Sequence, residues 1–106
     1  MTLGEYIKGL RESRKSIIKN KELVKKLEIT PQYWYDIEND KRIPSDYLLK
    51  NIANVLQLLD IEKIELYDLA SKAHKNEKIP VDIAEYLLKN NDMKKIIREK
   101  IYKEVK

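Results

Sequence analysis

Apolar residues recur along most of the chain at intervals of three and four residues, which is the period of an amphipathic α-helix. In the first four predicted helices the apolar stripes are Leu3, Tyr6, Ile7 and Leu10; Leu23, Val24 and Leu27; Trp34 and Ile37; and Leu48, Leu49, Ile52, Ala53 and Leu56. In the three that follow they are Ile61, Ile64, Leu66, Leu69 and Ala70; Ile83, Ala84, Leu87 and Leu88; and Met93, Ile96, Ile97, Ile101 and Val105. The pattern predicts an all-α protein.

Capping residues mark where these helices begin. Thr2 followed by Glu5 is a capping box, and it predicts a first helix that runs to about Lys15. Thr30 followed by Pro31 begins the third helix, because the threonine oxygen can accept a hydrogen bond from a free amide of the first turn and proline there loses none. The caps of the second, fourth and fifth helices are expected at Asn20, Ser45 and Asp60.

Composition supports a single helical domain and excludes several kinds of chemistry. The chain has 106 residues, of which 42% are hydrophobic and 38% charged, with only two glycines and three prolines to make turns. It has no cysteine and one histidine, His74, so that a thiolate or multi-histidine metal site is excluded. No stretch is apolar enough to cross a bilayer. We therefore expect a cytoplasmic protein without a metal or cofactor, and His74 is interpreted as an exposed residue near a helix end.

The charges permit nucleic-acid binding and show no catalytic pattern. Lys and Arg number 22 against 18 Asp and Glu, a net charge of +4, which can neutralise phosphates but is far from the charge of a histone-like protein. Acidic pairs such as Glu62 and Glu65 lie on a charged helix face with nothing beside them to suggest acid-base catalysis. The chain is not expected to be an enzyme.

The second and third predicted helices are separated by only three residues, Glu28 to Thr30, which is the length pattern of a helix-turn-helix. From Leu3 to about Leu59 the chain resembles the Cro/repressor family of helix-turn-helix domains, also called Xre-like. The residues that carry the resemblance are Leu10–Glu12, Glu22–Leu27, Ile37–Ser45, Leu48–Leu49 and Ile52–Leu56. Residues 66–73 and 80–98 are also similar to C-terminal extensions found on some bacterial members.

The resemblance implies a five-helix, repressor-like helix-turn-helix domain over residues 1–74 and a two-helix C-terminal extension over residues 75–106. Three positions depart from the family pattern: Val24 replaces an alanine, and Glu28 and Asp40 each replace a glycine. Glu28 and Asp40 are therefore expected in the left-handed backbone conformation that glycine adopts most readily. The segment from Lys15 to Lys19 is also about two residues longer than usual in the family.

Carried over residue by residue, the resemblance places the recognition helix at residues 30–38 and assigns two sets of DNA contacts. Base contacts fall on Pro31, Gln32, Tyr33 and Asp36. Phosphate contacts fall on Asn20, Tyr35, Asn39, Lys41 and Arg42. Gln32 is the strongest candidate, because its amide can bond bidentately to adenine and so discriminate bases by about 1–3 kcal/mol. Arg11 and Glu38 match positions that often form a structural ion pair.

Some of the same residues admit other interpretations. Tyr33, Trp34 and Tyr35 could form a stacking platform for single-stranded nucleic acid, but consecutive helical residues point about 100 degrees apart and form no flat surface. Trp34 is instead expected in the core, with both tyrosines exposed. The apolar stripes of the last two helices either fold back on the core or pair with a second chain.

The function predicted from these residues is sequence-specific binding of double-stranded operator DNA by a homodimer. The chain would then act as a transcriptional regulator, a repressor of the phage or mobile-element type. The alternative is a protein-interaction module of the same fold, antitoxin-like or an anti-regulator, with weak or no DNA binding.

Overall fold

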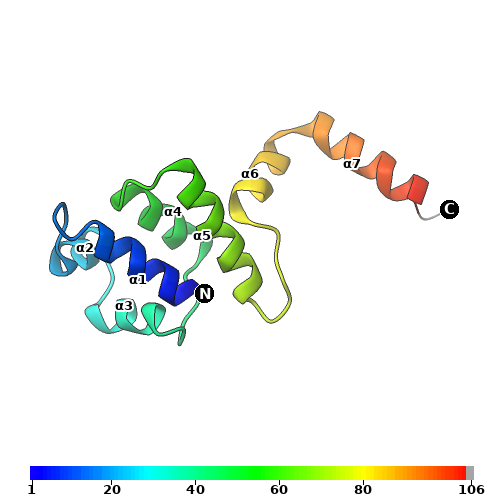
Figure 1. Cartoon of the computed structure of the whole chain (residues 1–106). Coiled ribbons are helices and arrows are strands. Elements are labelled where there is room, and N and C mark those ends of the chain that lie inside the picture. The colour runs from blue at the N-terminus through cyan, green and yellow to red at the C-terminus, as the bar shows by residue number, and fades with distance from the viewer. Residues whose placement is uncertain (105–106) are drawn as a thin grey trace.

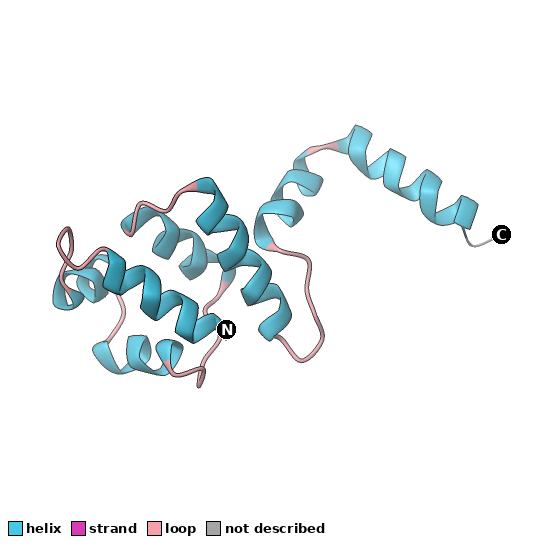
Figure 2. Cartoon of the chain, in the orientation of Figure 1, coloured by secondary structure: helices cyan, strands magenta, loops and turns pink. Residues whose placement is uncertain are grey.

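A computed structural model of the protein describes residues 1–104, and within that range the chain forms seven helices and no strand (Figures 1 and 2). The helices are α1 Leu3–Ser13, α2 Asn20–Lys26, α3 Pro31–Glu38, α4 Asp46–Val55, α5 Asp60–Ala73, α6 Val81–Lys89 and α7 Asn91–Glu104. The predicted all-α class is confirmed. Val105, assigned to the last apolar stripe, lies outside the described residues. No helix of residues 1–104 combines the length and the apolar character that a membrane crossing requires.

Three helix starts agree with the sequence prediction and two do not. Thr2 and Glu5 form the capping box of α1, and the side chains of Thr30 and Ser45 cap α3 and α4. Asn20 was predicted as a cap but is the first residue of α2, whose N-cap position is occupied by Lys19 without a side-chain bond. Asp60 is likewise the first residue of α5. The N-cap position is occupied by Leu59, whose backbone N–H donates to the carboxylate of Glu62 at 2.9 Å. The capping side chain therefore comes from the third residue of the helix.

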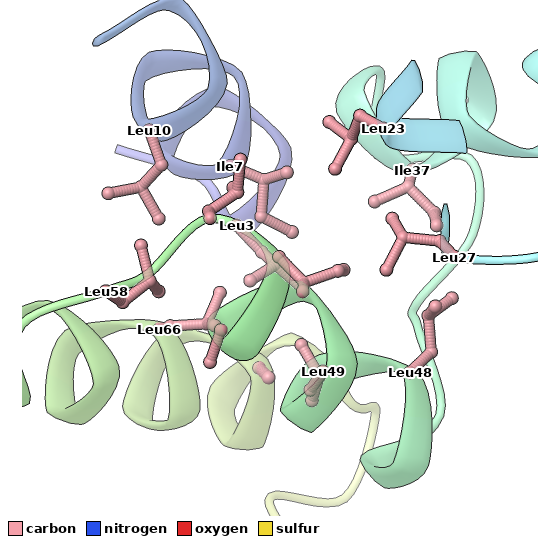
Figure 3. Packing of buried hydrophobic residues seen from close by; sticks show 14 of the residues in the cluster. Leu3, Ile7, Leu10, Leu23, Leu27, Ile37, Leu48, Leu49, Leu58 and Leu66 are labelled. Carbon is pink, nitrogen blue, oxygen red and sulfur yellow. The ribbon is translucent and has the colours of Figure 1, made fainter. Parts of the chain in front are cut away.

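The first five helices pack around one apolar core. Figure 3 shows leucines and isoleucines of these helices pointing toward one another. The most deeply buried large side chains, all less than 2% exposed, are Trp34, Ile7, Leu23, Ile37, Leu49, Ile52, Leu56, Leu66 and Pro44. Each of these except Pro44 belongs to one of the predicted apolar stripes, so the spacing of three and four located the core correctly through α4.

Helix α5 presents a different face to the core from the one predicted. Leu66 and Ala70 are buried as expected, but Ile61 is 75% exposed and Ile64 53% exposed. The buried positions include Tyr67 and Ser71, one residue after Leu66 and Ala70. Ile61 and Ile64 point away from that face because successive residues are about 100 degrees apart around a helix. Together with Leu59, which precedes the helix and is 66% exposed, we call these exposed apolar residues the α5 patch.

Three helices end in a left-handed residue that is not glycine. Glu28, Asp40 and Gln57 have φ values of 57°, 60° and 52°, and they follow α2, α3 and α4. In each case the next amide bonds back to the fifth residue before it, the pattern of a Schellman motif; these bonds are Ile29 to Val24, Lys41 to Asp36 and Leu58 to Ala53. The predicted left-handed conformation of Glu28 and Asp40 is confirmed, whereas that of Gln57 was not anticipated.

The C-terminal helices form an arm that leaves the five-helix body (Figure 1). Helix α6 stays attached to the body through buried Val81 and through an ion pair of 2.6 Å between Lys50 Nζ on α4 and Glu85 Oε1. Helix α7 projects beyond it. The radius of gyration is 16.3 Å, compared with about 13 Å for a compact domain of this length. In this structure the last helix therefore does not fold back on the core.

An unanticipated ion pair closes the body between α1 and α5. Arg14 donates from Nη1 to Glu62 Oε2 at 2.9 Å and from Nε to the Leu56 carbonyl, also at 2.9 Å. The hydrogen bond from Arg14 is the main reason that the pKa of Glu62 lies below its ordinary value of 4.5. Because both side chains are mostly covered, 15% and 22% exposed, the pair is screened less by water than an exposed one.

This pair predicts an acid-dependent loss of stability. Since the pKa of Glu62 is lower in the folded than in the unfolded chain, its contribution is complete well above pH 4.5 and is lost as the pH falls through the folded value. The free energy of unfolding of the wild type, measured with urea, should therefore fall as the pH drops below about 4.5. The dependence of this free energy on pH should be weaker in Glu62→Gln. Glu65→Gln, which removes an exposed carboxylate on the same helix, is the control. Equal slopes in all three proteins would show that Arg14 and Glu62 do not interact.

Candidate nucleic-acid interface

The turn between α2 and α3 is set by local hydrogen bonds. Helix α2 ends at Lys26 with Leu27 as its C-cap, and Glu28 takes the left-handed conformation. Thr30 then caps α3, because its side chain accepts from the Tyr33 amide at 3.0 Å. Pro31 occupies the first helical position. This compact connection separates two short helices by four residues and leaves one side of α3 in solvent, as a helix-turn-helix requires.

Two buried side chains and two polar contacts hold α3 in place. Trp34 and Ile37 are each 1% exposed and fix its inner face. At its C-terminal end, Glu38 accepts from Arg11 of α1 through both carboxylate oxygens, at 2.6 and 3.1 Å. This fork-to-fork geometry is the strongest form of an arginine-carboxylate pair. Helix α3 is thus fixed at one end to α1 and along its length to the core.

Asp40 forms the second contact with α1. Its Oδ1 accepts from the Gly4 amide at 2.8 Å and its Oδ2 from the Thr2 hydroxyl at 2.6 Å. The carboxylate therefore satisfies a free amide of the first turn of α1, where negative charge is also favoured by the helix dipole. These two bonds stabilise an aspartate in the left-handed conformation, which glycine adopts more readily.

Gly4 allows this close approach of α1 and α3. A Cβ atom at Gly4 would lie 2.5 Å from the carbonyl oxygen of Glu38, 2.7 Å from that of Ile37 and 2.8 Å from Asp40 Oδ1. Two of these atoms belong to the backbone and cannot rotate away. Only glycine fits here without separating the two helices.

The outer face of α3 carries the residues assigned to base contacts. Pro31 and Gln32 are exposed, and Tyr33 and Asp36 are half-buried. Gln32 Nε2 donates to Asp36 Oδ1 at 3.0 Å, so the two side chains form one unit a helical turn apart. Each amide nitrogen carries two hydrogens. One N–H and the carbonyl oxygen of Gln32 therefore remain free to face a ligand.

Two cations from the following loop lie against the aromatic residues of α3. The Arg42 guanidinium is 4.9 Å from the centre of the Tyr33 ring, and Lys41 Nζ is 5.6 Å from that of Tyr35, both within cation-π range. These contacts keep the positive charges beside the exposed face. Tyr35 is exposed as predicted, but Tyr33 is half-buried because it packs against the core.

The remaining assigned residues lie at helix ends. Asn39 is the C-cap residue of α3, and its side-chain amide donates to the Tyr35 carbonyl at 2.8 Å. Asn20 is exposed in the first turn of α2. Within residues 1–104 no three His, Cys, Asp or Glu side chains are grouped so as to hold a metal ion.

Comparison with known families now identifies the class of this fold. A family model described as Helix-turn-helix matches residues 5–64, more than half of the chain. The chain belongs to this family, the Cro/C1-type or Xre-like helix-turn-helix proteins. It is a family of DNA-binding transcription regulators and is typically non-enzymatic. Neither the search of curated proteins nor that of solved structures gave a match.

Several residues that position α3 were missed by sequence reasoning. Gly4 and the carboxylate of Asp40 act across distant parts of the chain, and so does the pair of Arg14 with Glu62, which joins α1 to α5 rather than positioning α3. No periodicity or capping motif signals such contacts. The one usable hint was the aspartate at position 40, since aspartate both tolerates the left-handed region and can cap a helix.

Proposed function

We propose that the chain is a cytoplasmic, homodimeric transcriptional repressor of the phage or mobile-element type that binds a specific DNA operator. Each protomer would place α3 in the major groove of one half-site, with half-sites about 34 Å apart. The observation that carries the proposal is the outer face of α3, where Gln32 is exposed and two cations flank the helix. Repression would follow because the bound dimer occludes the promoter.

In this proposal the roles of the α3 residues differ. Gln32 bonds to the N6 and N7 edge of adenine through its carbonyl oxygen and its free N–H. Asp36 holds the other N–H, which fixes which way the amide points, and Pro31 and Tyr33 complete the base-facing surface. Tyr35 and the polar groups of Asn20, Asn39, Lys41 and Arg42 contact phosphates, which position the protein without specifying sequence.

The test uses a duplex that the wild type selects from a random library. Gln32→Ala should lose about 1–3 kcal/mol of discrimination against unselected DNA, which is roughly 5- to 150-fold in the affinity ratio. Arg42→Ala should weaken binding to both duplexes about equally and lower the salt dependence by about one phosphate contact. Lys95→Ala removes the same charge from α7, away from α3, and should change little.

Titration by fluorescence anisotropy, with circular dichroism to establish that each variant folds, measures these effects. If the Gln32 and Arg42 variants bind as the wild type does, the outer face of α3 is not the DNA surface. If the library yields no selected duplex, sequence-specific binding is wrong altogether.

The α5 patch favours a second candidate function. Leu59, Ile61 and Ile64 expose three large apolar side chains close together in sequence on the body, and clustered exposed apolar side chains are typical of a protein-binding site. An antitoxin-like or anti-regulator protein of this fold would bind a partner there. The absence of any selected duplex, together with wild-type folding, would favour this function.

A further inference from the structure

Helix α7 carries an apolar stripe that no other part of the described chain covers. Met93, Ile96, Ile97 and Ile101 are 37%, 50%, 37% and 48% exposed. They recur at the spacing of one helix face. The N-terminus of the helix is capped by Asn90, whose Oδ1 accepts from the Met93 amide at 2.9 Å. Figure 1 shows α7 projecting away from the body with its sides open.

Three of the four stripe positions, Met93, Ile97 and Ile101, are symmetric about Ile97. Met93 precedes Ile97 by four residues and Ile101 follows it by four. If two copies of α7 cross antiparallel at Ile97, Met93 of each copy packs against Ile101 of the other and the two Ile97 side chains meet at the centre. These three positions of each copy then have an apolar neighbour in the other.

Two charged residues beside the stripe also favour the antiparallel arrangement. Asp92 and Lys103 are eleven residues apart, about three helical turns, and so lie on the same flank of α7. The midpoint between them falls beside Ile97. In the antiparallel pair, Asp92 of each copy therefore lies opposite Lys103 of the other, on both sides of the axis. In a parallel pair the same flank of the two helices lies on opposite sides of the interface, so Asp92 and Lys103 of one copy would not face those of the other.

We propose that α7 pairs antiparallel with α7 of a second copy of this chain, about a twofold axis at Ile97. The proposal deepens, and for its biological use rests on, the dimer of the proposed function. A helix of 14 residues is about 21 Å long, so the interface is small and the pairing weak in free solution. Two half-sites on one duplex would hold the copies together and strengthen it.

The register can be tested without DNA, because the chain has no cysteine of its own. Met93→Cys and Ile101→Cys are prepared as separate full-length proteins and oxidised at high concentration. The antiparallel pair predicts a disulfide-linked dimer in the mixture of the two and little in either alone. Efficient cross-linking of Met93→Cys with itself would show a parallel pair. The absence of cross-linking in the mixture, at concentrations where light scattering shows dimers, would show that another surface, such as the α5 patch, forms them.

Charge exchange provides a second, independent measurement. Asp92→Lys and Lys103→Asp each place like charges opposite each other in a homodimer and should lower the dimer fraction measured by sedimentation. Mixing the two variants should restore it, because each repelling pair becomes an attracting one. Failure of the mixture to recover would overturn the register. Since neither experiment contains DNA, a negative result here is separate from any failure of operator binding by the α3 variants.

Discussion

Gly4→Ala is expected to lower the free energy of unfolding by about 1–3 kcal/mol, the usual cost of overpacking. The reason is the backbone of α3: the added methyl group would lie 2.5 Å from the Glu38 carbonyl oxygen, so the two helices must separate. Separation also stretches the hydrogen bonds from the Gly4 amide to Asp40 and from Arg11 to Glu38, which fix the end of α3. We therefore expect weaker DNA binding in the fraction that remains folded.

Gly9 provides a matched control on the same helix. A Cβ atom there would have no neighbour within 4 Å. Gly9→Ala should raise the free energy of unfolding by about 0.5–1 kcal/mol, because alanine loses less backbone entropy than glycine in a helix. Urea unfolding measures both variants. If Gly4→Ala is as stable as Gly9→Ala, α1 and α3 do not approach as closely as the structure shows.

Asp40→Ala is the second change with a large expected effect. It removes the acceptor of the Gly4 amide and of the Thr2 hydroxyl, and it leaves an alanine in the left-handed region at φ 60°. Loss of a helix cap typically costs about 0.5–2 kcal/mol, and an alanine has no local hydrogen bond to offset the left-handed backbone. The total loss should be about 2–3 kcal/mol.

Two further substitutions at position 40 separate the cap from the backbone conformation. Asp40→Gly relieves the left-handed backbone but removes the cap, and Asp40→Asn keeps an acceptor for the Gly4 amide while tolerating the same φ. Thermal unfolding should place both variants between wild type and Asp40→Ala. An alanine variant as stable as the asparagine variant would mean that the Asp40 side chain contributes nothing to the contact with α1.

The sequence predicted the helices and most of the core because those features depend on near neighbours along the chain. The spacing of Leu48, Leu49 and Ile52, or the start of α3 at Thr30, needs no knowledge of the rest of the molecule. The predicted buried face of α5 was wrong at Ile61 and Ile64. Ile61 and Leu66 are equally apolar in the sequence, and only packing against α1 and α4 decides which of them is buried.

The candidate site was predicted as a set of residues but not as an arrangement. The resemblance located α3 and its polar positions. It did not show that Gln32 bonds to Asp36, or that Arg42 lies over Tyr33, because these depend on rotamers and on the path of the loop after α3. Nor did it show that Gly4 and Asp40 meet, since the two are 36 residues apart.

The most direct test of the central claim, that α3 binds duplex DNA, is the affinity of the wild-type protein for promoter DNA from neighbouring genes as salt is raised. The account predicts a steep and linear fall of the logarithm of the affinity with the logarithm of the salt concentration, with a slope of about 0.9 for each phosphate neutralised. An affinity that does not change between about 50 and 200 mM salt, or no binding at the lower concentration, would contradict it.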